Sequence, residues 1–171
     1  MRYLSFSILF ISLLSSCNLC HAMEWQGIVP LKSKRADVER LLGPNDTSNP
    51  VIYRLQNETV FIEYSSNNPC RRESSSEWIL PPRETWNVPV DTVVGIYVLD
   101  HKQILFSDLR LDVSAFRRVH GDDDLPTHFV YINDEGGFGV DVFYKDKDRE
   151  SVDGFHYWPE AKQRDRLCPD H

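Results

Sequence analysis

The sequence lacks the local motifs that identify most enzymes and metal proteins. It has no Gly-x-Ser-x-Gly nucleophile elbow, no two histidines four residues apart and no EF-hand calcium loop. Cysteine is scarce, with four residues in 171. After the N-terminus, no apolar stretch approaches the roughly 18 residues that a membrane-spanning helix needs. The sequence therefore predicts no catalytic, cofactor-binding or metal-binding residue from a motif, and no transmembrane segment in the mature chain.

Residues 1–22 have the pattern of a cleaved signal peptide. Arg2 supplies the positive charge, Leu4 to Leu14 form a short apolar run, and small and polar residues lead to Ala22. The run of about 11 residues is too short to cross roughly 30 Å of hydrocarbon. We therefore expect a single secreted or periplasmic domain over residues 23–171.

A second cleavage site competes with the first. Leu14 to Cys17 resembles a lipoprotein signal, in which Cys17 would carry the lipid anchor. Cleavage after Ala22 leaves an even pair, Cys70 and Cys168, whereas cleavage before Cys17 leaves Cys20 as an odd thiol. Cysteine pairing favours secretion, and a lipid-anchored envelope lipoprotein is the alternative.

Cys70 and Cys168 are predicted to form a disulfide. Neither lies in a Cys-x-x-Cys pair, which argues against a redox site. In the chain-entropy model a bridge closing such a long loop stabilises the fold by about 4 to 5 kcal/mol.

The charge balance is acidic. Cleavage after Ala22 removes one basic residue, Arg2, and none of the 26 acidic ones, so the net charge changes from −7 to −8. An acidic surface argues against nucleic acid as a partner. The partner is unknown; another protein or an envelope component would fit this charge.

Hydrophobic periodicity predicts an α+β fold. Lys34 to Leu42 has helical spacing, with Ser33 as the expected N-cap and Gly43-Pro44 as the stop, and Glu160 to Leu167 forms a short C-terminal helix after Pro159. Segments with strand patterns are Val51 to Leu55, Glu58 to Ser65, Asp91 to Leu99, Phe129 to Asn133, Phe138 to Tyr144 and Val152 to Trp158.

Two stretches do not follow a strand pattern cleanly. Residues 66–90 form a long irregular loop, and residues 104–119 fit either a strand or a helical turn. The prediction is one mostly antiparallel sheet of about six strands, packed against the N-terminal helix and the short C-terminal helix.

The two halves of the domain also suggest a diverged tandem repeat. Each half has a helical or turn segment followed by a three-stranded meander. In this correspondence three tyrosines of the first half match three of the second: Tyr53, Tyr64 and Tyr97 match Tyr131, Tyr144 and Tyr157.

Several segments resemble uncharacterised secreted proteins of soil bacteria. They are Gly27 to Gly43, Ile62 to Ser65 with Pro69-Cys70, Trp86 to Val93, and Tyr157 to Pro159 with Leu167-Cys168. That group implies no activity. The helix ending in Leu41-Leu42-Gly43-Pro44 before a meander is more distantly similar to the beta-lactamase inhibitor protein and the small lipoprotein of the outer-membrane barrel assembly machinery. This likeness implies a non-catalytic binding module that uses a sheet face.

Carboxylate-rich segments and strand histidines are the metal candidates that we weighed. Asp122-Asp123-Asp124, and the run Asp146, Asp148, Glu150 and Asp153, offer oxygen ligands without calcium-loop spacing, so solvated turns are favoured. Of the mature histidines (His101, His120, His128, His156 and His171), His128 and His156 lie in predicted strands and could meet across a sheet. A structural role is favoured over zinc.

Trp78 and Trp86 in the 66–90 loop are the residues that suggest a binding surface. Aromatic side chains in loops beside a rigid sheet often mediate binding, and the alternative is that they cover an edge of the core. The favoured function is a non-catalytic binding or interaction module. The alternatives are a small secreted hydrolase, marked by a pocket where histidine and carboxylates converge, and an envelope lipoprotein with a scaffold role.

Overall fold

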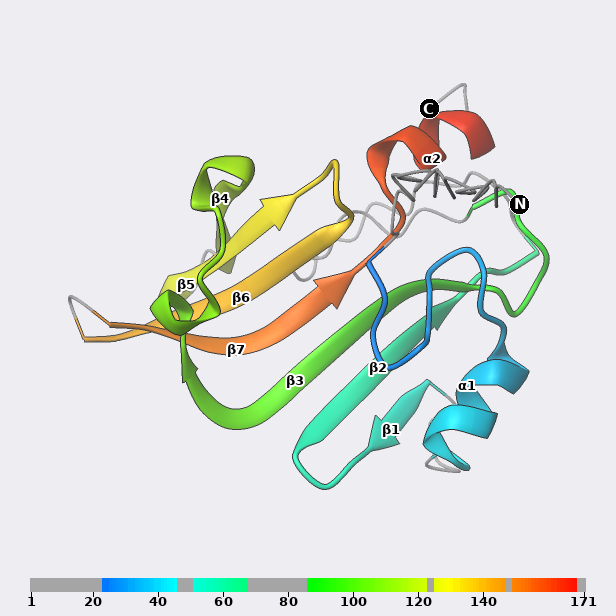
Figure 1. The fold of residues 1–171 in the computed structure, drawn as a ribbon, viewed down its shortest axis with the longest axis horizontal. Coiled ribbons are helices and arrows are strands. Elements are labelled where there is room, and N and C mark those ends of the chain that lie inside the picture. The colour runs from blue at the N-terminus through cyan, green and yellow to red at the C-terminus, as the bar shows by residue number, and fades with distance from the viewer. Residues whose placement is uncertain (1–22, 46–50, 68–85, 123–124, 147–148, 169–171) are drawn as a thin grey trace, which may run out of the picture.

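The structure, a computed structural model, describes residues 23–45, 51–67, 86–122, 125–146 and 149–168 (Figure 1). In these ranges a seven-stranded antiparallel sheet is accompanied by two α-helices and two short 3₁₀ turns. The predicted α+β fold with a mostly antiparallel sheet is therefore confirmed. The expected count of about six strands was one too low.

The two helices are α1 (Arg35–Leu42) and α2 (Ala161–Leu167), and the 3₁₀ turns are η1 (Phe106–Leu109) and η2 (Val113–Ala115). The strands are β1 (Ile52–Arg54), β2 (Glu58–Tyr64), β3 (Val93–Leu105), β4 (Arg117–Asp122), β5 (Leu125–Asn133), β6 (Phe138–Asp146) and β7 (Arg149–Tyr157).

The strand order is β1-β2-β3-β7-β6-β5-β4, which is two meanders joined side by side. The first meander is β1-β2-β3 and the second is β4-β5-β6-β7. Strands β3 and β7 pair antiparallel in the middle, with Val98 opposite Phe155. In Figure 1 these two long strands cross the centre of the sheet.

The additional strand comes from the segment whose conformation the sequence left open, residues 104–119. Strand β3 continues beyond the expected end at Leu99 to Leu105, after a register shift between Leu99 and Ile104. The chain then turns through η1 and η2, where Arg110 has a left-handed φ of 51°. Strand β4 follows and pairs with β5, so the segment contains both a strand and helical turns.

Helix α1 begins one residue later than predicted. Lys34 is the N-cap residue, and its backbone N–H donates to the Asp37 carboxylate at 3.0 Å. Ser33 is buried instead, where its hydroxyl accepts a hydrogen bond from the Val29 N–H at 3.0 Å. Gly43 ends the helix with a φ of 83°, a conformation that glycine adopts without steric cost.

One face of the sheet, the α1 face, carries most of the core. Helix α1 packs Val38 against Tyr53 and the apolar residues of β2 and β3. Phe155 and Tyr157 of β7 continue this core to Phe106, which stacks on Tyr131 with ring centroids 4.2 Å apart. One apolar layer therefore runs beneath both meanders.

The opposite face, the Asp141 face, has a mixed layer. Val130, Ile132 and Trp158 form a small apolar cluster there. Beside it, the Tyr97 ring of β3 lies close over the backbone of its β7 neighbour Gly154. A Cβ at Gly154 would lie 2.6 Å from the Tyr97 ring and 2.8 Å from the Val98 carbonyl oxygen. Only glycine at this position permits that close approach.

We expect Gly154→Ala to lower the free energy of unfolding by about 1 to 3 kcal/mol, because the methyl group meets a packed ring and a backbone carbonyl. Urea unfolding measures the loss. Gly95→Ala is the matched control in β3, since its Cβ would meet mainly the movable end of the Glu63 side chain at 3.0 Å. Equal losses in the two variants would contradict this account of Tyr97 packing.

Candidate functional site

A buried polar cluster lies at the centre of the Asp141 face. Its members come from adjacent strands: His128 from β5, Asp141 from β6, and His156 from β7, with Tyr97 from β3 beside them. His156 Nε2 is 2.8 Å from Asp141 Oδ2, and His128 Nε2 is 3.8 Å from Asp141 Oδ1. The first distance is a hydrogen bond and the second is too long for one. Asp141 thus stands between two imidazoles.

All three ionisable side chains of the cluster are shielded from solvent. Asp141, His128 and His156 are 4%, 6% and 3% exposed. The His156 ring stacks on Tyr97 at 4.3 Å between centroids, and the His128 ring stacks on Phe143 at the same distance. The rings are therefore fixed in orientation as well as buried.

The environment stabilises the charged form of Asp141. Burial by itself raises the pKa of this carboxyl, but the two facing histidines, with a smaller contribution from the Tyr97 hydroxyl, outweigh burial and hold the pKa well below its usual range. Burial, and then the charge of Asp141, raise the pKa of Tyr97 well above its usual value. Asp141 is therefore a carboxylate and Tyr97 a neutral phenol at physiological pH.

The hydrogen-bonding capacity of the cluster is only partly used. His156 Nδ1, both ring nitrogens of His128, and Asp141 Oδ1 are buried without a hydrogen-bond partner among the described residues. Neither histidine has a serine or cysteine within hydrogen-bond distance in that part of the chain. The His156–Asp141 pair therefore has the base and orienting carboxylate of a hydrolytic triad, without an adjacent nucleophile among the residues that the structure describes.

The sequence pointed to part of this cluster. His128 and His156 were expected to meet across a sheet, and they lie on one face with β6 between them. Asp141 was missed, although a single charged residue between Val140 and Val142 in an apolar strand is a signal of a partnered buried carboxylate. Tyr97 gave no sequence signal, because its neighbours across the sheet are fixed by the register of β3 and β7.

A second cluster lies on the α1 face over the outer strands β4 to β7, and we call it the Arg118 surface. The Arg118 guanidinium lies 3.6 Å from the centroid of the Phe129 ring and donates to the Tyr144 hydroxyl at 2.8 Å. Tyr131 donates to Glu150 at 2.9 Å, and Arg118 approaches the same carboxylate at 3.9 Å. Burial, and then Glu150, raise the pKa of Tyr131 to about 12.

The Arg118 surface is partly open to solvent. The Arg118 side chain is 40% exposed, and Phe129, Tyr131 and Tyr144 have intermediate exposure. The His120 ring of β4 is exposed and lies 4.5 Å from Phe129 between centroids. Aromatic rings and an arginine that keep accessible surface are typical of contact sites for other molecules.

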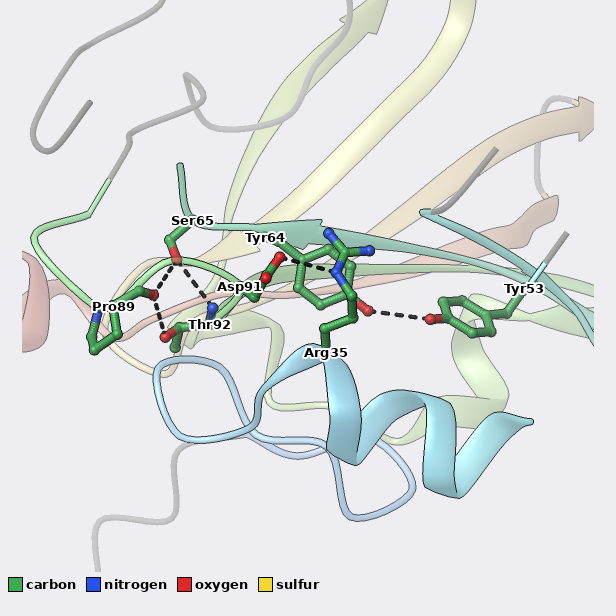
Figure 2. Close-up of polar contacts among 7 residues, drawn as sticks. All are labelled: Arg35, Tyr53, Tyr64, Ser65, Pro89, Asp91 and Thr92. Carbon is green, nitrogen blue, oxygen red and sulfur yellow. Dashed lines mark hydrogen bonds and ion pairs between the residues drawn. The ribbon is translucent and has the colours of Figure 1, made fainter. Parts of the chain in front are cut away.

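The first meander carries a similar arrangement beside helix α1, shown in Figure 2. Arg35 of α1 lies 4.0 Å from the centroid of the Tyr64 ring and bonds Asp91 at 2.9 Å, and the Tyr64 and Tyr53 hydroxyls are 3.3 Å apart. Tyr53 is 2% exposed because α1 packs over it. The arginine–tyrosine contact fastens the helix here.

The connection that leads into β3 is also held by hydrogen bonds beside Arg35 (Figure 2). The hydroxyls of Ser65 and Thr92 both donate to the Pro89 carbonyl, at 2.6 and 2.5 Å, and the Thr92 N–H donates to the Ser65 hydroxyl. These contacts hold the entry to β3 against the end of β2, and their role is structural.

The proposed binding residues of the 66–90 loop are only partly described. Trp86 is 6% exposed, so its indole does not contribute to an exposed surface, which favours the alternative that it covers part of the core. Trp78 lies outside the described residues. So does Cys70, whereas Cys168 follows α2 with intermediate exposure, and the bridge between the two cysteines stays a prediction.

Of the metal candidates, Glu150 and His101 are bonded to other side chains. Within the described ranges, no three His, Cys, Asp or Glu side chains form a group that could hold a metal ion. Glu150 is bonded to Tyr131, and His101 Nε2 is 3.2 Å from the Thr59 hydroxyl. Asp123, Asp124, Asp148 and His171 lie outside those ranges.

No protein-family model matches the chain, and comparisons with curated proteins and with solved structures gave no significant match. None of the helices in the described part of the chain is long and apolar enough to cross a membrane.

We expect Asp141→Asn to lower the free energy of unfolding at pH 7 by about 1.5 to 3 kcal/mol, because the buried His156 N–H loses its charged acceptor. The folded pKa of Asp141 is depressed, so its stabilisation is present above the unfolded value of about 3.9 and is lost as the pH falls below it.

The difference between wild type and Asp141→Asn should therefore shrink below about pH 4 in urea unfolding measured across pH. Asp165→Asn, an exposed position on α2, is the control and should stay close to wild type. A constant difference from pH 7 to pH 3 would show that Asp141 is not a charged partner.

Proposed function

We propose that this chain is a secreted or periplasmic, non-catalytic interaction protein that binds another protein through the Arg118 surface. The observation that carries the proposal is the partly exposed Arg118–Phe129–Tyr144 contact on the outer strands. Flat aromatic rings supply contact area at small cost in side-chain entropy, and an arginine adds charged hydrogen bonds.

The comparison between the two meanders supports the same assignment. In the first meander, helix α1 packs over Tyr53, which is 2% exposed, and supplies the arginine that contacts Tyr64. In the second meander, Phe106 of the short turn η1 stacks on Tyr131, and Phe129 and Tyr144 keep solvent contact beside Arg118. The tyrosine that α1 buries in the first half, Tyr53, thus has a partly exposed counterpart in the second half, Tyr131.

We also infer that the fold is a diverged tandem repeat, with β1, β2 and β3 corresponding to β5, β6 and β7. The mirrored strand order supports this, and so do two tyrosine pairs that share the α1 face: Tyr53 with Tyr131, and Tyr64 with Tyr144. The third expected pair does not fit, since Tyr97 lies on the Asp141 face and Tyr157 on the α1 face.

A hydrolase is the weaker alternative. It is supported by the His156–Asp141 hydrogen bond, and it is opposed by the burial of that pair and by the missing neighbouring nucleophile among the described residues. An envelope scaffold role differs from the main proposal only in the lipid anchor at Cys17.

Arg118→Glu is expected to abolish partner capture while the chain stays folded. The tagged protein is recovered after chemical crosslinking in its own host, and captured proteins are identified by mass spectrometry. Arg40→Glu is the matched control, because Arg40 is 68% exposed on α1 and undergoes the same charge change away from the surface. A partner captured equally by wild type and both variants would remove the Arg118 surface from binding.

Mass spectrometry of the protein recovered from its host tests export and pairing together. We expect a mature N-terminus at Met23 and, in a non-reducing digest, a peptide linking Cys70 to Cys168. An acylated Cys17 at the N-terminus would favour the lipoprotein. Recovery of the intact chain with both thiols reduced would contradict secretion and the disulfide.

A further inference from the structure

The Arg118 guanidinium keeps most of its hydrogen-bond donors available to another molecule. An arginine side chain has five N–H donors. In the part of the chain that the structure describes, Arg118 uses one of them, in the bond from Nη2 to the Tyr144 hydroxyl at 2.8 Å. The side chain is 40% exposed, so another molecule can reach it. A group that accepts two N–H bonds at once, such as a carboxylate, matches the planar fork of the guanidinium.

The neighbouring carboxylate of Glu150 does not fill this role. Glu150 Oε1 lies 3.9 Å from Arg118 Nη2, a distance that allows charge attraction but no hydrogen bond. The same oxygen accepts the Tyr131 hydroxyl proton at 2.9 Å. A hydrogen bond with Glu150 is also the main cause of the raised pKa of Tyr144. Glu150 is thus engaged by two tyrosines.

A comparable arginine in the first meander does have a bonded carboxylate. Arg35 lies 4.0 Å from the centroid of the Tyr64 ring, and its Nε donates to Asp91 Oδ1 at 2.9 Å (Figure 2). Within the described residues, Arg118 has the same kind of aromatic contact without a hydrogen-bonded carboxylate. The contact that the chain completes internally beside α1 is therefore left for a partner to complete on the outer strands.

The guanidinium of Arg118 is held in place before any partner binds. It lies 3.6 Å from the centroid of the Phe129 ring, and its bond to Tyr144 restrains it further. Less side-chain entropy is lost on binding when the group is already restrained. The exposed His120 ring lies 4.5 Å from Phe129 between centroids. Aromatic rings thus flank the guanidinium and offer contact to an apolar group beside the carboxylate.

The charge of the whole chain narrows the source of that carboxylate. The net charge is −7, so a polyanion such as nucleic acid, or an anionic membrane, would meet repulsion along its whole length. A single carboxylate meets the local positive charge of Arg118, because charges further than about 10 Å away are largely screened at 0.1 M salt. The observations favour one acidic side chain of a protein.

We propose that the partner places an Asp or Glu side chain on the Arg118 guanidinium, with a neighbouring apolar side chain of the same segment against Phe129 and Tyr144. This inference rests on the proposed function, because it names the chemistry that the Arg118 surface recognises. The charge of Glu150 opposes the incoming carboxylate, so neutralising Glu150 should strengthen the contact.

Selection from a phage-displayed library of random peptides tests the inference without a known partner. The library is panned against the full mature chain and against Arg118→Gln. We expect the peptides that require Arg118 to be enriched in Asp or Glu next to an aromatic or aliphatic residue. A selection that returns no peptide dependent on Arg118, or returns such peptides without an acidic residue, would overturn the inference.

Arg117→Gln is the matched control for this selection. Arg117 is the same residue type on the same strand, and it points to the opposite face, where it is paired with Asp134 at 2.7 Å. This variant should select the same peptides as wild type. Loss of those peptides in both variants would show that the general charge of β4, and not the Arg118 surface, determines binding.

Calorimetric titration with one selected peptide gives the sign of the interaction. Replacing the acid of the peptide by its amide should weaken binding to wild type about tenfold to hundredfold, and should change binding to Arg118→Gln far less. Glu150→Gln should bind the acidic peptide more tightly, since it removes a like charge and keeps an acceptor for Tyr131. Weaker binding to Glu150→Gln, or an equal loss with Arg118→Gln, would contradict the proposed contact. The comparison of the two peptides on wild type requires no variant to fold.

Crosslinked capture separates this result from that of the proposed function. If capture depends on Arg118 but the selected peptides carry no acidic residue, the Arg118 surface binds a partner of different chemistry, and only the present inference is wrong. If Arg118→Glu captures the same partner as wild type, the proposed function is wrong as well.

Discussion

The pairing of β3 with β7 is the constraint on which the rest of the structure depends. It joins two meanders that are otherwise built from strands adjacent in sequence, and it aligns the apolar layer of the α1 face across both halves. The same register brings Tyr97 over Gly154 and beside His156. Both the core and the buried polar cluster therefore follow from one ladder between residues far apart in the chain.

Short-range sequence signals were sufficient to predict that the β5–β6 hairpin and helix α1 would form. The hairpin of β5 and β6 was expected from Gly136-Gly137, and the structure has Asn133 opposite Phe138 on either side of that turn. Helix α1 was expected from its periodicity and its Gly43 stop. Its start differed by a residue because Ser33 is used by the backbone of Val29, which only tertiary packing determines.

Features that depend on strand register could not be predicted from the chain alone. The continuation of β3 past Leu99 requires a bulge opposite β7, and the formation of β4 requires the free side of β5. Strand positions indicated that His128 and His156 could lie on one face, whereas the role of Asp141 depends on being the residue of β6 that lies between them. The Arg118 surface was missed for the same reason, since its aromatic residues come from different strands.

The two faces of the sheet carry different kinds of side chain. The α1 face contains the apolar core and, at its outer end, aromatic rings that remain accessible beneath Arg118. The Asp141 face contains ionisable groups that are withdrawn from solvent. The accessible aromatic rings and the buried ionisable groups thus lie on opposite faces, so either set is open to substitution without altering the residues of the other.

The two outer strands of the sheet affect how readily the chain pairs with other chains. An exposed outer strand offers unpaired backbone groups to other chains and invites aggregation. Here one outer strand, β1, is only three residues long, and the other, β4, begins with Arg117-Arg118. A short strand and a pair of positive charges are two established ways of discouraging edge-to-edge association. Arg118, which contacts the aromatic rings of the Arg118 surface, thereby also places charge on that edge of the sheet.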